Sequence, residues 1–248
     1  METPDSEGTG TMTTTATPET TDRTTDGTLA SLTAARLLVA SIDSRGRTLV
    51  VHQQLRPALV AATMIDAERA GLLVTAFDGR HTVLRRTPET ASDGLLAAVV
   101  DGCDGRTVQS AVNRLALSTW SGGAVDLRRP LLELLAADGV LRREPRGGLA
   151  RERWFPDPEV QRLVVAPVLT ALCGDVVDET VDPGTAALVA AAAVSTQLVH
   201  RIVRTHAPAT CSTSPRVVRR RAARVLEAEP LALATHRALA AMMGAAAA

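Results

Sequence analysis

The sequence predicts a mainly α-helical protein, a single helical domain around a central buried apolar helix, with two short β-hairpins. Residues 184–203 are small and apolar on every face as far as Val194, and a helix that is apolar all round must be buried. Apolar residues recur at helical spacing in several other segments. Two turn signals, Asp78-Gly79 and Pro145–Gly148, each separate short runs that favour strands.

The central helix is expected to follow Asp182-Pro183, because proline is tolerated in the first helical turn. Polar residues interrupt the run from Ser195 onwards, and alanine contributes little to membrane insertion. We therefore expect a core helix rather than a membrane span. Its small side chains would let other helices pack close to it.

The first 28 residues differ in composition from the rest. They are rich in threonine and hold six acids and one arginine, a net charge of −5. So few apolar residues cannot offset the entropy of ordering, which predicts a disordered acidic tail at 1–28 and a folded domain at 29–248. Because the whole chain is neutral, residues 29–248 carry +5. This charge suits an anionic partner, although every basic residue is arginine, which indicates a compositional bias.

The first half of the domain is expected to contain mixed elements. They are a helix at 29–42 ending in the turn Asp43–Gly46, a helix at 57–70 opened by Arg56-Pro57 and stopped by Gly71, strands at 72–77 and 81–86, and short helices near 94–100 and 107–119.

The second half repeats helices around one hairpin. We expect a helix at 125–138 capped by Gly139, strands at 140–143 and 149–154, a helix at 158–173 with Asp157 as its N-cap, an acidic linker at 175–182, and, after the central helix, helices at 215–227 and 231–243.

Motifs for catalysis or metal binding are missing from the sequence. It has no GxSxG, P-loop, GxGxxG or HExxH pattern, and its five histidines are scattered. The three cysteines lie far apart and include no CxxC pair, which favours a reducing compartment over a disulfide framework or a zinc site. No signal-peptide pattern opens the chain. We therefore expect a cytoplasmic protein that is not an enzyme and has no cofactor or metal.

Two arginine-proline motifs are predicted at helix starts. Arg56 precedes Pro57, and Arg128 and Arg129 precede Pro130. The helix dipole disfavours a cation there by about 0.3–1 kcal/mol. An anion shared between the guanidinium groups and the free backbone N–H groups would reverse that preference.

At these residues the chain resembles the Golgi phosphoprotein 3 family, which includes the yeast adaptor that retains glycosyltransferases. The similarity runs in order through most of residues 31–243. It includes TAARLLVASIDSRGRT, the Leu-Arg pair at 55–56, Glu68–Leu72, Thr107-Val108-Gln109, Thr119-Trp120, LLELLAADGVL with its following hairpin, and Asp182-Pro183.

The resemblance implies a single helical domain and a peripheral membrane protein that binds phosphatidylinositol 4-phosphate. The family's pocket uses a tryptophan and several arginines. Arg56 and Arg128 match two of these arginines, whereas a third falls on Val125. No aromatic residue lies between Arg47 and Arg56, so the matching tryptophan is missing.

The family's second hairpin is apolar and inserts into membranes, whereas here its tip is polar and basic and begins with Arg142 and Arg143. Adsorption to a membrane surface then fits better than insertion. We expect Arg56 and Arg128 to clamp a phosphate of an anionic phospholipid headgroup, with Arg129, Arg142 and Arg143 adding positive potential. We expect the protein to associate peripherally with the inner face of a membrane. A protein client and a second copy of the chain, in a homo-oligomer, are further expected partners.

The alternative is a winged-helix DNA-binding protein. Helix 107–119, helix 125–138 and the basic hairpin follow the order of that fold. The helix that would enter the groove reads LLELLAAD, which is apolar and acidic and offers little to base edges.

Overall fold

The computed structural model describes residues 32–77, 81–91, 94–117, 125–145, 152–174, 181–208, 211 and 214–245. The predicted tail at 1–28, the tip of the second hairpin and most of the acidic linker lie outside these ranges. Ten α-helices are described: α1 Thr33–Ala40, α2 His52–Arg69, α3 Gly94–Cys103, α4 Val108–Val112, α5 Arg128–Ala137, α6 Pro158–Cys173, α7 Pro183–Ala193, α8 Thr196–His206, α9 Pro215–Glu227 and α10 Pro230–Ala245. A π-helical turn, η1 Asn113–Leu117, continues α4.

Two small antiparallel sheets complete the described fold. The first has the order β1–β2–β3, with β1 Leu73–Phe77, β2 Thr82–Arg86 and β3 Arg106–Thr107. The second pairs β4 Leu141–Glu144 with β5 Arg153–Pro156. The prediction of a mainly α fold with two hairpins is confirmed, and the short strand β3 is an addition that the sequence did not reveal.

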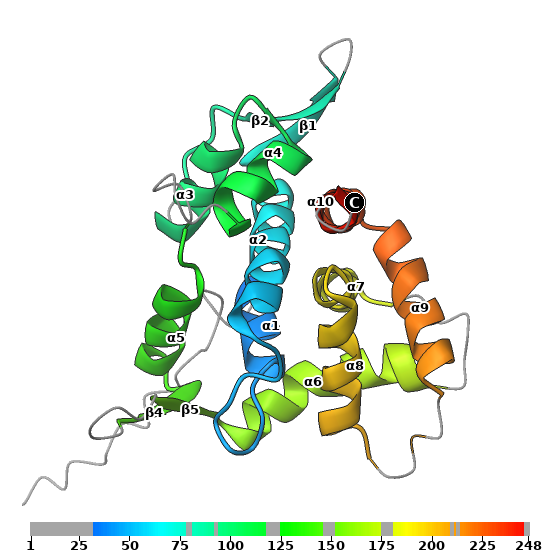
Figure 1. Ribbon diagram of the computed structural model, residues 1–248. Coiled ribbons are helices and arrows are strands. Elements are labelled where there is room, and N and C mark those ends of the chain that lie inside the picture. The colour runs from blue at the N-terminus through cyan, green and yellow to red at the C-terminus, as the bar shows by residue number, and fades with distance from the viewer. Residues whose placement is uncertain are drawn as a thin grey trace, which may run out of the picture.

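The helix α7 lies in the middle of the molecule. It packs against α1, α2, α6, α8, α9 and α10, and Figure 1 shows it end-on among them. Ala190, Ala191 and Val189 are completely buried, and Val194 is 4% exposed. The prediction of a buried central helix is therefore confirmed, and its alanines let the neighbouring helices approach closely.

The predicted extent of the central helix was wrong, because residues 184–203 form two helices. The chain leaves the helix at Val194 and Ser195, and the axes of α7 and α8 differ in direction by 118°. The physical reason is the change of pattern: α7 is apolar on all sides, whereas α8 buries Leu198 and Ile202 and exposes Gln197. Such a one-sided helix belongs at the surface.

No single helix in the described ranges is long and apolar enough to cross a membrane, and α7 with α8 reach that length and composition only together, across their bend.

The start of α2 was also predicted wrongly. The helix begins at His52, with Val51 as its N-cap, and Pro57 lies inside it. Pro57 has no N–H to donate a helical hydrogen bond to the carbonyl of Gln53. Because Gln53 is exposed, water can take the place of this donor. Arg56 is therefore the fifth residue of the helix, and the argument that placed it among free N–H groups at a helix start does not hold.

The turn between α1 and α2 is fixed by short polar contacts. The Asp43 carboxylate accepts the N–H groups of Arg45 and Arg47, each at 2.9 Å. Gly46 adopts φ +70°, and its carbonyl accepts the N–H of Trp154 at 3.4 Å. A Cβ at Gly46 would lie 3.1 Å from the Phe155 ring. The predicted turn is thus real, and it is fastened to strand β5.

Candidate anion-binding site

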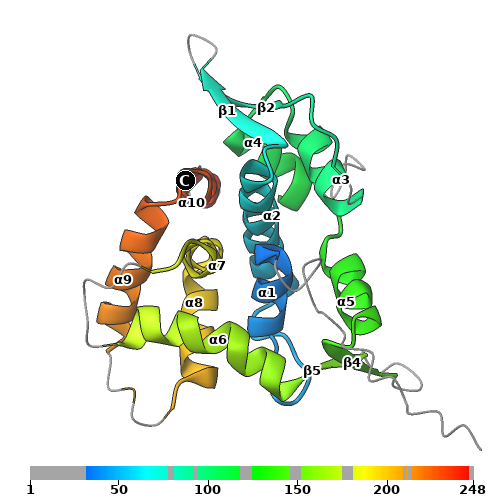
Figure 2. The same cartoon turned by 180° about the vertical axis from the view of Figure 1, so that it is seen from behind.

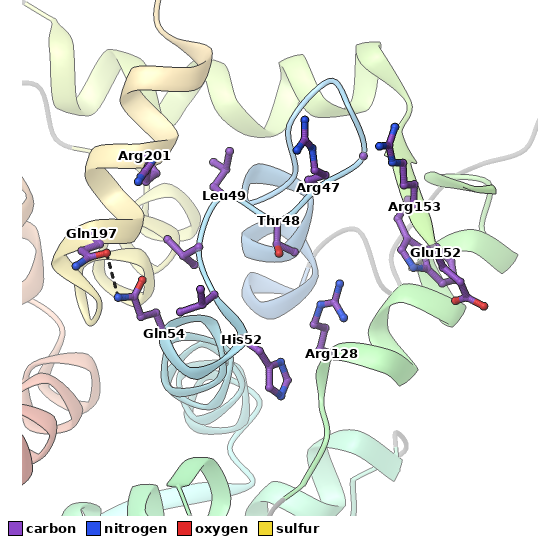
Figure 3. A pocket seen from close by; sticks show the side chains of 14 residues that line it. Arg47, Thr48, Leu49, His52, Gln54, Arg128, Glu152, Arg153, Gln197 and Arg201 are labelled. Atoms are coloured by element: carbon purple, nitrogen blue, oxygen red, sulfur yellow. Dashed lines mark hydrogen bonds between the residues drawn. The ribbon is translucent and has the colours of Figure 1, made fainter. Parts of the chain in front are cut away.

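A pocket of about 820 Å³ opens between the turn after α1, the first residues of α2 and α5, strand β5 and helix α8. Figure 3 shows its lining side chains. Four arginines, Arg47, Arg128, Arg153 and Arg201, line it together with His52. Glu152 is the single acid among the described residues of this lining, and it forms an ion pair with Arg143. The pocket therefore concentrates positive charge.

Arg128 reaches this pocket from the first position of α5. Its backbone N–H donates to the Asp126 carboxylate at 3.2 Å, which orders the start of the helix. In Figure 3 the guanidinium projects from the helix start into the space facing Thr48. The prediction that places Arg128 at a helix start is confirmed by this geometry.

The charges of Arg56 and Arg128 both act on His52. Burial lowers the pKa of His52, and the positive charges of Arg56 and Arg128 lower it further, against the carboxylate of Asp126. The imidazole is therefore neutral at pH 7, so the positive charge of the site comes from arginine. His52 and Arg56 are one turn apart on α2, on one face of the helix.

Arg56 is not among the residues that line the pocket, although its charge acts on the lining residue His52. Its Nε is buried, and no acceptor among the described residues receives its hydrogen bond. A buried donor without a partner costs about 1–3 kcal/mol, so an added anion or water there would be stabilising. Arg56 and Arg128 thus share a neighbour in His52. Their sharing of one phosphate stays a prediction.

Arg129, Arg142 and Arg143 do not line the pocket. Arg129 is exposed and its Nε pairs with Glu133 at 2.9 Å on the same helix. Arg142 and Arg143 lie on β4, with their guanidinium carbons 5.0 Å and 5.6 Å from the ring centroids of Phe155 and Trp154. Arg142 therefore adds positive potential next to the pocket, whereas the charge of Arg143 is offset by its ion pair with Glu152.

Trp154 is the aromatic residue of the pocket. It comes from β5, and its backbone is fastened to Gly46. The family resemblance places an aromatic residue in the loop before Arg56. Trp154 belongs to a segment far along the chain, so the resemblance did not predict it. The pairing of an Arg-Arg strand with a Trp-Phe strand was the available signal.

Arg47, Arg153 and Arg201 were missed for a similar reason. The sequence around each of these arginines has no feature that indicates a binding site. Only the fold brings the three side chains to one cavity. On the α8 side the amide of Gln54 donates to the Gln197 side chain at 3.0 Å, which ties α2 to α8 at the pocket wall (Figure 3).

The described residues contain no group of three or more His, Cys, Asp or Glu side chains placed to hold a metal ion. Cys173 and Cys211, distant in sequence, do meet in the fold. Burial raises the pKa of the Cys173 thiol to about 12, with a further contribution from its hydrogen bond with Cys211. This thiol is protonated at neutral pH and is a poor nucleophile and metal ligand.

Most of the chain matches the model of a known protein family. A family model described as Golgi phosphoprotein 3 (GPP34) matches residues 32–243. No curated protein matches the chain.

Proposed function

The chain belongs to the Golgi phosphoprotein 3 family, and we propose on this basis that it binds the anionic headgroup of a membrane phospholipid in the arginine-lined pocket. Family membership supports a membrane-associated, adaptor-like role at a coarse level. The protein would act by binding rather than by catalysis. It would attach peripherally to the inner face of a membrane and could hold a protein client there.

The observation that carries this proposal is the charge of the pocket. Four arginines line one cavity, and Glu152, the one acid that the structure describes in its lining, is paired with Arg143 outside it. A surplus of guanidinium groups around a partly enclosed space gives a positive potential that attracts an anion. Phosphate accepts several charge-assisted hydrogen bonds from guanidinium groups, each stronger than a neutral one.

The size of the pocket is consistent with a headgroup. Its volume of about 820 Å³ lies within the ordinary range for small-molecule pockets, about 300–1,000 Å³. Trp154 supplies an apolar wall, and Gln54 and Gln197 supply amide groups that can meet hydroxyls. These features favour a phosphorylated sugar headgroup of the phosphatidylinositol 4-phosphate type.

Two adjacent arginines provide a sharp test. Arg128 lines the pocket, whereas Arg129 faces solvent and pairs with Glu133. Calorimetric titration with soluble glycerophosphoinositol 4-phosphate should show at least about a tenfold loss of affinity for Arg128→Glu, since a hydrogen bond to a charged group contributes about 1.5–3 kcal/mol. Arg129→Glu makes the same change in net charge and should stay within about twofold of wild type.

Equal losses for both variants would mean that only the general charge matters. Unchanged binding by Arg128→Glu would remove the headgroup from this pocket.

The winged-helix alternative has less support. The buried side of α5 consists of Leu131, Leu132 and Leu135, and Glu133 is exposed beside its partner Arg129. A recognition helix would instead present unpaired donors to the bases.

A further inference from the structure

We propose that one end of the molecule, formed by the turn at 43–48, helix α8 and the first half of α9, lies flat on an anionic membrane surface, held by arginines outside the pocket. This rests on the proposed function, because the turn and α8 also line the pocket. The contact would be made by exposed cations of α8 and α9 rather than by an apolar hairpin.

Helix α8 carries basic residues outward from the pocket. Arg201 lines the pocket, and Arg204 follows it by nearly one turn on the exposed side. Leu198 and Ile202 are buried on the opposite side. The polar face of α8 therefore runs without a break from the pocket wall to the outer surface.

Helix α9 has a stronger concentration of charge. Its exposed face carries four arginines, Arg216, Arg219, Arg220 and Arg224, while Val218, Ala222 and Leu226 are buried on the other side. Its first turn contains Arg216 and no acid. A cation there works against the helix dipole, so the stability of the helix itself does not explain this charge.

The arginines of α8 and α9 differ from other surface arginines, such as Arg162 on the neighbouring helix α6, which pairs with Glu159 at 2.7 Å. Among the described residues, Arg204, Arg216 and Arg220 form no ion pair with an acid. At the opposite end, Arg69 pairs with Glu229 and Arg86 pairs with Asp101, each at 2.7 Å. Figures 1 and 2 show the turn after α1, the end of α8 and the start of α9 at one end of the molecule, and the sheet β1–β2 at the other.

A lipid surface fits this arrangement better than a nucleic acid or an acidic peptide. The arginines come from separate segments spread across one end of the protein, and they are continuous with a pocket that would hold one lipid headgroup. Basic residues near an anionic bilayer each contribute about a factor of five in binding. Several of them together would turn a weak headgroup contact into stable adsorption.

The test compares two double variants with the same change in net charge. Arg204→Glu with Arg220→Glu alters the proposed membrane face outside the pocket. Arg114→Glu with Arg237→Glu alters exposed arginines on η1 and α10. Sedimentation uses vesicles of phosphatidylcholine and phosphatidylglycerol, and calorimetry uses soluble glycerophosphoinositol 4-phosphate. Thermal unfolding verifies that both variants fold.

We expect the Arg204/Arg220 variant to lose at least about 25-fold in vesicle affinity while it binds the soluble headgroup like wild type. The Arg114/Arg237 variant should match wild type within about threefold. Equal vesicle binding by the two variants would overturn the membrane face and leave the headgroup pocket intact. A gel shift with duplex DNA is run on the same proteins, and loss of DNA binding by the Arg204/Arg220 variant without loss of vesicle binding would also overturn the membrane face. Failure of wild type to bind the soluble headgroup would instead count against the proposed function.

Discussion

Side chains from distant segments form hydrogen bonds with the backbone at both ends of helix α1. Asp66 on α2 accepts the N–H groups of Thr33 and Ala34, at 3.0 and 3.2 Å, and so caps α1, whose own N-cap residue is the apolar Leu32. Gln161 on α6 donates to the carbonyls at the other end of α1. Buried backbone groups need such partners. These contacts therefore fix how α1, α2 and α6 meet.

Removal of the Asp66 carboxylate should therefore weaken the fold. Asp66→Ala leaves two buried N–H groups without an acceptor, which should lower the free energy of unfolding by about 2–3 kcal/mol in urea titrations at pH 7. Asp66→Asn keeps one acceptor oxygen and should lose less. A variant Asp66→Ala as stable as wild type would show that water replaces the carboxylate without cost.

The same residue predicts a dependence on pH. Burial raises the pKa of Asp66, against the opposing effect of its hydrogen bonds with Thr33 and Ala34. The folded state then binds the proton more tightly than the unfolded chain. The stability that wild type gains relative to Asp66→Asn should fall as pH rises from the ordinary aspartate range through the raised pKa of Asp66. Urea titrations of both proteins across that range measure it, and a constant difference would contradict it.

At the scale of elements, end signals decide how well a helix can be predicted from sequence. The bounds of α6 and α9 match the prediction, because Asp157 and Ser214 cap helices that open with proline. For α2 the proline was misleading, since the helix starts five residues earlier and tolerates Pro57 inside it. The break after α7 has no glycine or proline to mark it. Only the change from an all-round to a one-sided apolar pattern indicates it.

The central element gives a stringent stability test. Ala191 on α7 is completely buried among apolar neighbours. Ala191→Asp should unfold the domain, because an unpaired buried charge costs several kcal/mol. Ala223→Asp on the exposed face of α9 serves as the matched control and should fold normally. Circular dichroism during heating would distinguish them, and an unchanged melting temperature for Ala191→Asp would disprove the burial of α7.

At the scale of the whole molecule, the candidate site was only partly predictable. Arg128 was found because a helix start and a family position coincide there. Arg47, Arg153, Arg201 and Trp154 come from three separate segments, and no local pattern predicts that the fold brings these segments together. Arg129 was assigned to the site from its position next to Arg128, but successive residues of a helix point in directions about 100° apart.

Membrane association should depend strongly on salt. With no apolar hairpin tip, Coulomb attraction is the main force, and it decays over about 8 Å at physiological salt and about 3 Å at 1 M. Sedimentation with anionic vesicles should therefore show much weaker binding at high salt. Reversal of both Arg142 and Arg143 to Glu should reduce binding further without loss of fold. Binding that survives high salt would require an apolar contact.

Trp154, whose backbone is bonded to the turn at Gly46, lines the pocket, so its fluorescence can indicate whether the pocket is occupied. The chain has two tryptophans, Trp120 and Trp154, and no tyrosine. In a Trp120→Phe background, ultraviolet emission comes from one indole that lines the pocket beside the Arg143 guanidinium. Indole fluorescence responds to nearby charge, so occupation of the site could be followed optically, without a label, while the protein is in solution.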